Sequence, residues 1–334
     1  MFSSLHVVVC SDTNFGLAKL RPFFWSLRQA HSGVDLRLHY LLVNGSQAYT
    51  QEVGAYCAAL GLPVSFHEIG AQVEAAFAGG VEENTKWTLA IYGRLFMAEV
   101  LPPEVERAVY MDFDTICVGD LRELLAQTAG CQTVAAAVNL PDFYSAGKED
   151  GLNAGVLVVP VDAWRRDGIA AQLVAVFMDY KRIGAPVPFY DQGLLNAVFA
   201  GRWMKIPLAW NAQAFVDGAC GIVPLAIWKS AELAKTQLFH YAGTTKPWSS
   251  PNAWMAFPKP AALAYARAMV GVEKAGRYGF LILFYRLLAI GCLELPQGSL
   301  RLRFLHRLSE VVFGRESPLV VFRWLGGAFS RRIR

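Results

Sequence analysis

Residues 107–121 read Arg-Ala-Val-Tyr-Met-Asp-Phe-Asp-Thr-Ile-Cys-Val-Gly-Asp-Leu, an apolar run that ends in two carboxylates, Asp112 and Asp114, with one residue between them. Composition predicts a buried strand over residues 109–111, and the Gly-Asp pair that follows marks the exit from it. Open α/β sheets bind ligands at this end of their strands. Alternation along an extended chain places both carboxylates on the same side, where like charges so close need a counter-ion.

The Asp-x-Asp triplet is open to three interpretations. Most such triplets are solvated loop acids. Residues 112–116, Asp-Phe-Asp-Thr-Ile, also fit the Asp-x-Asp-x-Thr signature of haloacid-dehalogenase-like phosphatases, and they equally fit the metal-binding Asp-x-Asp of nucleotide-sugar glycosyltransferases. The phosphatases need a later lysine with an Asp-Asp or Gly-Asp-x-x-x-Asp motif, and their first motif lies near the N-terminus. The chain contains no Asp-Asp, so the phosphatase interpretation is the weaker one.

The composition is that of a globular protein with a sizeable core, since 54% of the 334 residues are hydrophobic and 17% are charged. The six cysteines form no Cys-x-x-Cys pair, which argues against a zinc ribbon, a redox dithiol or a disulfide framework and favours a reducing compartment. The N-terminus has no basic region before its first apolar strand, so we expect no secretion signal.

Strand and helix patterns alternate along the chain with short links, as in α/β proteins with parallel strands. Strands are predicted at residues 7–10, 36–43, 63–68, 133–138 and 152–159, and helices at 16–31, 47–60, 84–99, 121–128 and 162–182. Residues 139–151 read as a polar loop, and residues 203–228 as an aromatic, loop-like stretch.

Polar residues recur at the predicted strand ends and helix starts. Asp12 and Asn14 follow the first strand at its ligand-binding edge. Arg94 is the one interior cation of the predicted 84–99 helix, well beyond Lys86 in its first turn, and it either points at the acidic rim or lies on the surface. Asn153 reads as a turn residue followed by a bulge glycine, and Asp191 reads as a helix N-cap when taken alone.

His240 comes at the end of a further predicted strand, before Gly243 and Lys246. A lone histidine is more often a core or surface residue than a ligand. Together with Asp112 and Asp114, however, a neutral imidazole makes a mixed nitrogen and oxygen set that suits Mn²⁺ better than Ca²⁺ and leaves positions open for phosphate oxygens and water.

Six blocks, in this order, resemble glycosyltransferase family 8 over residues 5–255. This family comprises the retaining nucleotide-sugar transferases that include bacterial lipopolysaccharide galactosyl- and glucosyltransferases and, more distantly, glycogenin. The blocks are Val7-Val-Val-Cys-Ser-Asp-Thr-Asn14, Tyr92-Gly-Arg-Leu95, Tyr110-Met-Asp-Phe-Asp114, Asn153-Ala-Gly-Val156, Asp191-Gln192 and His240-x-x-Gly243-x-x-Lys246-Pro-Trp248.

The resemblance implies a Rossmann-like mixed sheet of the GT-A type within a catalytic domain at residues 1–260, with a UDP-sugar as donor. It implies that Asp112, Asp114 and His240 are ligands of Mn²⁺, with Mg²⁺ as the alternative. Donor contacts are implied for Asp12, Asn14, Asp112, Gly243 and Lys246, and a catalytic or donor-sugar role for Arg94, Asn153, Asp191 and Gln192.

The resemblance also shapes the expected mechanism. Retention needs either a nucleophile on the far face of the sugar or attack by the acceptor from the leaving-group face. The far-face residue looks like Gln192, a poor nucleophile, so we favour same-face attack with the departing phosphate as base and with Asp191 and Gln192 positioning the sugar. Galactose or glucose is the expected hexose, and lipopolysaccharide or another surface-glycan precursor is the expected acceptor.

Three departures from the family pattern bear on donor-sugar identity. Asn139 stands where an aspartate is common, Gly193 stands where another acid is usual, and Lys86 and Trp87 occupy a stretch that covers the nucleotide in relatives.

The predicted second domain, residues 261–334, is helical and basic. Residues 301–334 hold eight arginines against two glutamates, a net charge of +6. Residues 278–293 are apolar but are interrupted by Arg286 and too short to span a bilayer, so they form either a buried helix or an interfacial one. Residues 319–334 mix Trp and Phe with arginines, as helices on anionic membranes do.

We therefore expect a peripheral protein on the cytoplasmic face of the membrane, with a glycan or glycolipid acceptor and no nucleic-acid partner. A non-catalytic, membrane-associated scaffold with a decayed site is the remaining alternative.

Overall fold

The computed structural model describes residues 4–81, 88–143, 151–216, 225–249 and 253–273. The chain divides into two compact units, Met1–Thr244 and Thr245–Arg334. The predicted boundary at residue 260 separates a catalytic from a membrane-associating region, and this functional division stays a prediction.

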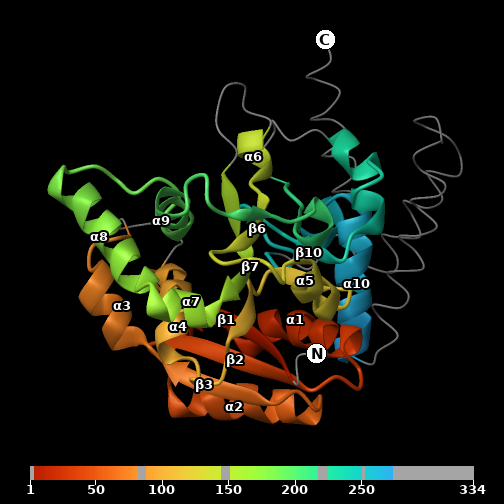
Figure 1. Cartoon of the computed structure of the whole chain (residues 1–334). Coiled ribbons are helices and arrows are strands. Elements are labelled where there is room, and N and C mark those ends of the chain that lie inside the picture. The colour runs from red at the N-terminus through yellow and green to blue at the C-terminus, as the bar shows by residue number, and fades with distance from the viewer. Residues whose placement is uncertain (1–3, 82–87, 144–150, 217–224, 250–252, 274–334) are drawn as a thin grey trace, which may run out of the picture. The chain divides into compact units, whose positions relative to one another are not determined.

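A seven-stranded mixed sheet forms the centre of the first unit, in the order β3-β2-β1-β4-β7-β6-β8 (Figure 1). Its strands are β1 (Leu5–Asp12), β2 (Leu36–Val43), β3 (Val64–Glu68), β4 (Arg107–Met111), β6 (Ala135–Val138), β7 (Leu152–Pro160) and β8 (Met204–Lys205). The first four strands run parallel, while β7 is antiparallel to both β4 and β6. The α/β fold class with a mixed sheet is confirmed.

A small sheet adjoins the exit of β4. It has the order β5-β10-β9, from β5 (Thr115–Cys117), β9 (Ala212–Gln213) and β10 (Leu238–His240). The stretch that the sequence predicted as loop-like therefore supplies one of its strands. Because β10 pairs antiparallel with β5, residues more than a hundred positions apart meet beside the acidic triplet.

Helices cover both faces of the large sheet and bury two apolar clusters against it (Figure 1). One cluster takes side chains from α1 (Leu17–Ala30), α2 (Gln47–Ala59) and α5 (Leu121–Gln127), and the other from α3 (Gly70–Phe77), η1 (Leu89–Phe96), α4 (Met97–Val100), α7 (Val161–Arg166), α8 (Ile169–Arg182) and α9 (Asp191–Val198). Burial on both faces explains why β7 is apolar almost throughout.

Three local predictions need correction. The described part of 84–99 is mainly the 3-10 helix η1, followed by the short α4, rather than one α-helix. The 162–182 helix is two helices, because Gly168 adopts left-handed φ and ψ of 61° and 41° between α7 and α8. Within the predicted 139–151 loop, α6 (Leu140–Phe143) forms one helical turn.

Short 3-10 turns complete the first unit at η2 (Leu208–Trp210), η4 (Leu225–Lys229) and η5 (Leu233–Lys235). In the second unit the described elements are η6 (Ala253–Ala256) and α10 (Lys259–Glu273). The predictions for 278–293 and 301–334 lie outside the described residues, as do Lys86 and Trp87.

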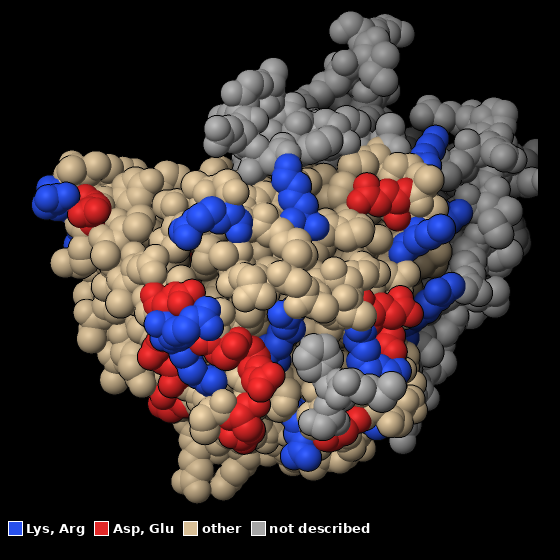
Figure 2. All heavy atoms as spheres, viewed as in Figure 1, with Lys and Arg blue, Asp and Glu red and all other residues tan. Residues whose placement is uncertain are grey.

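Among the described residues, no helix combines the length and the apolar composition that crossing a bilayer requires. On the face that Figure 2 shows, lysines and arginines are interspersed with acidic side chains.

Candidate active site

Asp112 and Asp114 lie in the turn between β4 and β5, with Phe113 between them. Phe113 is 5% exposed and packs into the apolar cluster under α1, so its neighbours both turn away from that core. The backbone fixes the turn at each end, because the Asp112 N–H donates to the Gly155 carbonyl (2.8 Å) and the Asp114 carbonyl accepts from the Tyr241 N–H (2.8 Å). The predicted shared side of the two carboxylates is confirmed.

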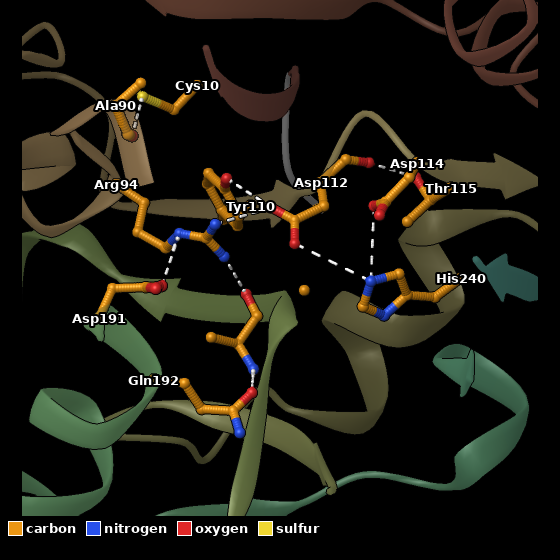
Figure 3. A network of polar contacts seen from close by, with 12 residues as sticks. Cys10, Ala90, Arg94, Tyr110, Asp112, Asp114, Thr115, Asp191, Gln192 and His240 are labelled. Carbon is orange, nitrogen blue, oxygen red and sulfur yellow. Dashed lines mark hydrogen bonds and ion pairs between the residues drawn. The ribbon is translucent and has the colours of Figure 1, made fainter. Parts of the chain in front are cut away.

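His240 ends β10 and brings its imidazole to the two carboxylates (Figure 3). His240 Nε2 is 3.4 Å from Asp114 Oδ1 and 3.9 Å from Asp112 Oδ2. Each of the three side chains offers one ligand atom, and these atoms lie within 4.8 Å of one another. Two carboxylate oxygens and one imidazole nitrogen form a donor set that fits a first-row divalent cation such as Mn²⁺.

Gly155 on β7 provides the space that the imidazole occupies. A Cβ at this position would lie 2.2 Å from His240 Cε1, closer than any side chain permits. The glycine was predicted to mark a bulge, but its structural role is close packing against the ring. The Asn-Ala-Gly stretch therefore leaves room for the side chains of Asp112, Asp114 and His240, which we call the metal-ligand cluster for the role that we propose for them.

Arg94 connects the cluster to Asp191 (Figure 3). Its Nη2 lies 2.9 Å from Asp112 Oδ1, its Nε lies 3.0 Å from Asp191 Oδ2 in an ion pair, and its Nη1 donates to the Ala154 carbonyl at 2.7 Å. The guanidinium also stacks over Tyr110, 4.5 Å from the ring centroid. Arg94 is 8% exposed, so the rim-facing interpretation is confirmed and the surface interpretation is wrong.

Electrostatics keep Arg94 charged and make Asp191 a weaker acid. Burial alone would lower the pKa of Arg94, but the adjoining carboxylates of Asp112 and Asp191 raise that pKa above its usual value. Burial raises the pKa of Asp191 to about 6, although Arg94 acts to lower it. Asp191 therefore exchanges its proton much closer to neutral pH than an exposed aspartate does.

Asp191 and Gln192 open α9, whose N-cap is Tyr190 rather than the predicted Asp191. Gln192 Oε1 accepts a hydrogen bond from the Ala154 N–H at 3.1 Å, which fixes the side-chain amide against β7. Gly193 has a structural reason as well, because a Cβ there would lie 1.7 Å from the Pro188 carbonyl oxygen. The acid that is usual in relatives cannot be accommodated by this backbone.

The remaining predicted donor contacts occupy three places. Asp12 ends β1 and accepts from the Asn14 backbone (2.9 Å) and from Asn14 Nδ2 (3.1 Å), so these two residues pair with each other. Gly243 follows His240 with a left-handed φ of 89°. Lys246 belongs to the second unit, where its backbone N–H donates to Ser249 Oγ. The donor-binding roles of all these residues stay predictions.

Sequence reasoning assigned no role to two residues that contact the cluster. Tyr110 donates from its hydroxyl to Asp112 Oδ1 at 2.7 Å, and its position two residues before the acid, on the same side of β4, was the available signal. Asn211 contacts His240 Nδ1 at 2.9 Å, and only the pairing of β9 with β10 brings it there. Nothing in the local sequence around Asn211 indicates this contact.

Comparison with known proteins places these features in a family. The model of glycosyl transferase family 8 matches residues 7–252. The lipopolysaccharide 1,2-glucosyltransferase of Escherichia coli K12 is 25% identical over 185 residues, and the lipopolysaccharide 1,3-galactosyltransferase of Salmonella typhimurium LT2 is 25% identical over 186 residues. Each alignment covers 52% of this chain and 52% of the relative. The chain spans about half or less of the length of the curated relatives it matches.

The fold is also that of a solved structure, the galactosyltransferase LgtC in complex with donor and acceptor sugar analogues. The TM-score is 0.62 at 22% identity, over 79% of this chain and 96% of the other.

Proposed function

The chain belongs to glycosyl transferase family 8, and from this membership we propose that it transfers a hexose, with retention of anomeric configuration, from a UDP-sugar to a glycan acceptor in a metal-dependent reaction. UDP-galactose or UDP-glucose is the proposed donor. The two alternatives, a haloacid-dehalogenase-like phosphatase and a non-catalytic scaffold, are not favoured by the family match.

The convergence of Asp112, Asp114 and His240 on one point carries the proposal. Mn²⁺, or Mg²⁺ in its place, is the cation that these residues would hold. When bound, it supplies positive charge beside the diphosphate, where negative charge develops as the sugar leaves. Asp112 is the member that ties this position to the rest of the site, since its Oδ1 is engaged by Arg94 and Tyr110 while its Oδ2 faces His240.

Arg94 links the three possible metal ligands to Asp191 and Gln192. Because the guanidinium lies between Asp112 and Asp191, it fixes the distance from the metal ligands to the start of α9. We propose that Asp191 and Gln192 position the sugar there. Asn153 lies nearby on β7, where its Oδ1 accepts a hydrogen bond from the Gly155 N–H.

Gln192 supports attack of the acceptor from the leaving-group face. Its carbonyl oxygen, the only nucleophilic atom of the side chain, already accepts the Ala154 N–H. A neutral amide oxygen held in this way is a poor nucleophile, so the acceptor hydroxyl attacks directly and the departing phosphate takes its proton. Asp191 and Gln192 then stabilise the positive charge and the orientation of the sugar rather than forming a bond to it.

For the acceptor, we propose lipopolysaccharide or another surface-glycan precursor, in line with the two lipopolysaccharide transferases that this chain resembles. The arginine-rich stretch 301–334 would hold the protein on the anionic cytoplasmic face of the membrane. A chain truncated after residue 299 should then stay in the supernatant when the full chain sediments with anionic vesicles. Equal sedimentation of both would rule out this role of the tail.

UDP release from a panel of UDP-sugars, with Mn²⁺ or with chelator, tests the proposed activity. We expect slow hydrolysis of one donor by the wild type, loss of that hydrolysis with chelator, and a loss of at least about 100-fold in Asp114→Asn, because the metal set is incomplete. Asp120→Asn is the matched control, because it makes the same chemical change at an acid that caps α5 and pairs with Arg122 and His31 instead of facing His240.

Donor binding is measured in the same samples, because an obligatory acceptor would suppress hydrolysis without abolishing binding. Failure of the wild type to bind any UDP-sugar in the presence of Mn²⁺ would overturn the proposal.

A further inference from the structure

Three buried amides connect the end of β6 to the imidazole of the metal-ligand cluster. Asn153 Nδ2 lies 3.1 Å from Asn139 Oδ1, Asn211 Nδ2 lies 2.9 Å from Asn153 Oδ1, and Asn211 Oδ1 lies 2.9 Å from His240 Nδ1. The three asparagines are 6% exposed or less, and Asn211 is fully buried. We call Asn139, Asn153 and Asn211 the amide relay.

One backbone group sets the direction of the whole relay. The Gly155 N–H lies 3.1 Å from Asn153 Oδ1 and can only donate, so the atom of Asn153 that faces it is the carbonyl oxygen. Asn211 must then present its NH₂ to that same oxygen. Its own carbonyl oxygen consequently faces His240, and no amide of the relay can flip without placing two donors or two acceptors against each other.

An acceptor facing Nδ1 decides which nitrogen of His240 carries the proton. A neutral imidazole has one N–H and one lone pair. With Asn211 Oδ1 at Nδ1, the proton resides on Nδ1 and the lone pair on Nε2, the nitrogen that faces Asp112 and Asp114. The opposite tautomer would set two lone pairs against each other in a buried site.

We propose that Asn211, oriented by Asn153, is a positioning residue that holds His240 in the Nδ1–H tautomer, so that its Nε2 lone pair is ready for a divalent cation. The inference rests on the proposed function, because it presumes that the cluster binds metal. The buried amides would then raise the affinity for the cation, since a histidine binds a metal more tightly when its second ring nitrogen donates a hydrogen bond.

The relay also gives Asn153 a role different from the predicted contact with the donor sugar. An amide can make four hydrogen bonds, and Asn153 makes three of them within the protein, to Asn139, Asn211 and Gly155. Asn139, the departure from the family pattern, supplies the acceptor at the far end. An aspartate at that position would also accept, so the relay is compatible with either residue.

The tautomer is measurable in the metal-free protein by long-range ¹H–¹⁵N correlation on ¹⁵N-histidine-labelled chain. We expect a protonated Nδ1 for His240, assigned by its absence in His240→Gln and by its broadening when Mn²⁺ is added. A metal-free wild type in which Nδ1 carries no proton and Nε2 does would overturn the inference whether or not the protein transfers sugar.

Variants at Asn211 test the consequence for metal affinity. The affinity is measured by titration with Mn²⁺, with the electron paramagnetic resonance signal of the free ion as readout. Asn211→Leu removes the acceptor with a side chain of the same branching, and we expect it to weaken Mn²⁺ binding about 10- to 100-fold and to yield mixed His240 tautomers. Asn211→Asp keeps an acceptor at Nδ1 and should recover most of the affinity.

Gln213→Leu is the matched control, because Gln213 is an equally buried amide two residues along the same segment but bonds the backbone of residues 138 and 140 instead. Each variant is first checked for a wild-type circular dichroism spectrum and cooperative melting. If Asn211→Leu and Gln213→Leu weaken Mn²⁺ binding equally, Asn211 acts through packing and the inference is wrong.

The two proposals fail in different ways. Wild type that binds no Mn²⁺ at all refutes the metal-dependent function, while the tautomer in the metal-free state still supports or contradicts the relay. Wild-type Mn²⁺ affinity in Asn211→Leu refutes the relay and leaves the proposed function intact.

Discussion

Two groups of buried or half-buried polar side chains, one at the carboxyl end of β4 and one across β1, β2 and β3, differ in how their atoms are arranged. In the metal-ligand cluster, Asp112 Oδ2, Asp114 Oδ1 and His240 Nε2 converge on one point. In what we call the histidine ladder, His6 on β1, His39 on β2 and His67 on β3 follow one another across neighbouring strands, with contacts of 3.0 Å and 3.2 Å between successive ring nitrogens.

In the ladder each imidazole is hydrogen bonded to the next, whereas in the cluster three possible ligands of a cation face one another. Each neutral imidazole has one donor and one acceptor, so three rings in a row can pass hydrogen bonds along the chain without any ion. Burial lowers the pKa of each ladder histidine, with that of His39 falling to about 3, which keeps the rings neutral. In the cluster, by contrast, two carboxylate oxygens and one imidazole nitrogen face a common point, as the ligands of a cation do.

The largest expected effect follows from removing Arg94, which is buried between Asp112 and Asp191. Arg94→Met leaves Asp112 and Asp191 without their counter-charge, and we expect a loss of about 3–5 kcal/mol in the free energy of unfolding at pH 7.5, measured with urea. Adding Asp191→Asn should restore part of it, because one uncompensated charge is then gone. A loss below about 1 kcal/mol would show that these carboxylates are solvated and would weaken the contrast with the ladder.

A cation should stabilise the cluster and leave the ladder unchanged. At a free Mn²⁺ concentration of about 100 times Kd, we expect about 2.7 kcal/mol of added stability for the wild type, reversed by chelator. His39→Leu should show the same gain and Asp114→Asn none. Loss of the gain in His39→Leu would mean that the ladder, and not the cluster, is the metal site.

Per pH unit, the smallest effect belongs to the ladder. Because the pKa of His39 is lower in the folded protein than in the unfolded chain, the neutral ring stabilises the fold fully above about pH 6.5, and this contribution is lost as pH falls toward 3. Neighbouring His6, His67 and Arg37 add to the burial that causes the shift.

Within that window, each pH unit of acidification should lower the free energy of unfolding by up to about 1.4 kcal/mol. His39→Leu should remove this part of the pH dependence. Urea unfolding from pH 7 to pH 4 measures it. Parallel stability profiles for His39→Leu and wild type would show that the ladder is protonated as readily in the fold as in the unfolded chain.

Family membership and much of the fold could be predicted from local patterns. The alternation of apolar strands with helices predicts an α/β sheet because each pattern depends on residues within one element. Breaks within helices are harder to predict from the sequence. Gly168 shows why, since a single left-handed residue splits a helix without disturbing its apolar spacing. The short η1 and α4 likewise satisfy the helical spacing that predicted one longer helix.

The sequence by itself determined which side chains are candidates for the chemistry: an acidic triplet after a buried strand, a histidine at the end of another, and an Asp-Gln pair at a helix start. Tertiary structure decided how they act together. The pairing of β10 with β5 brings His240 to the acids, a missing Cβ at Gly155 makes room for its ring, and Arg94 lies between Asp112 and Asp191. Asn211 reaches His240 only through the pairing of β9 with β10. These contacts join residues far apart in the chain, and their energies depend on burial and direction, which no local pattern encodes.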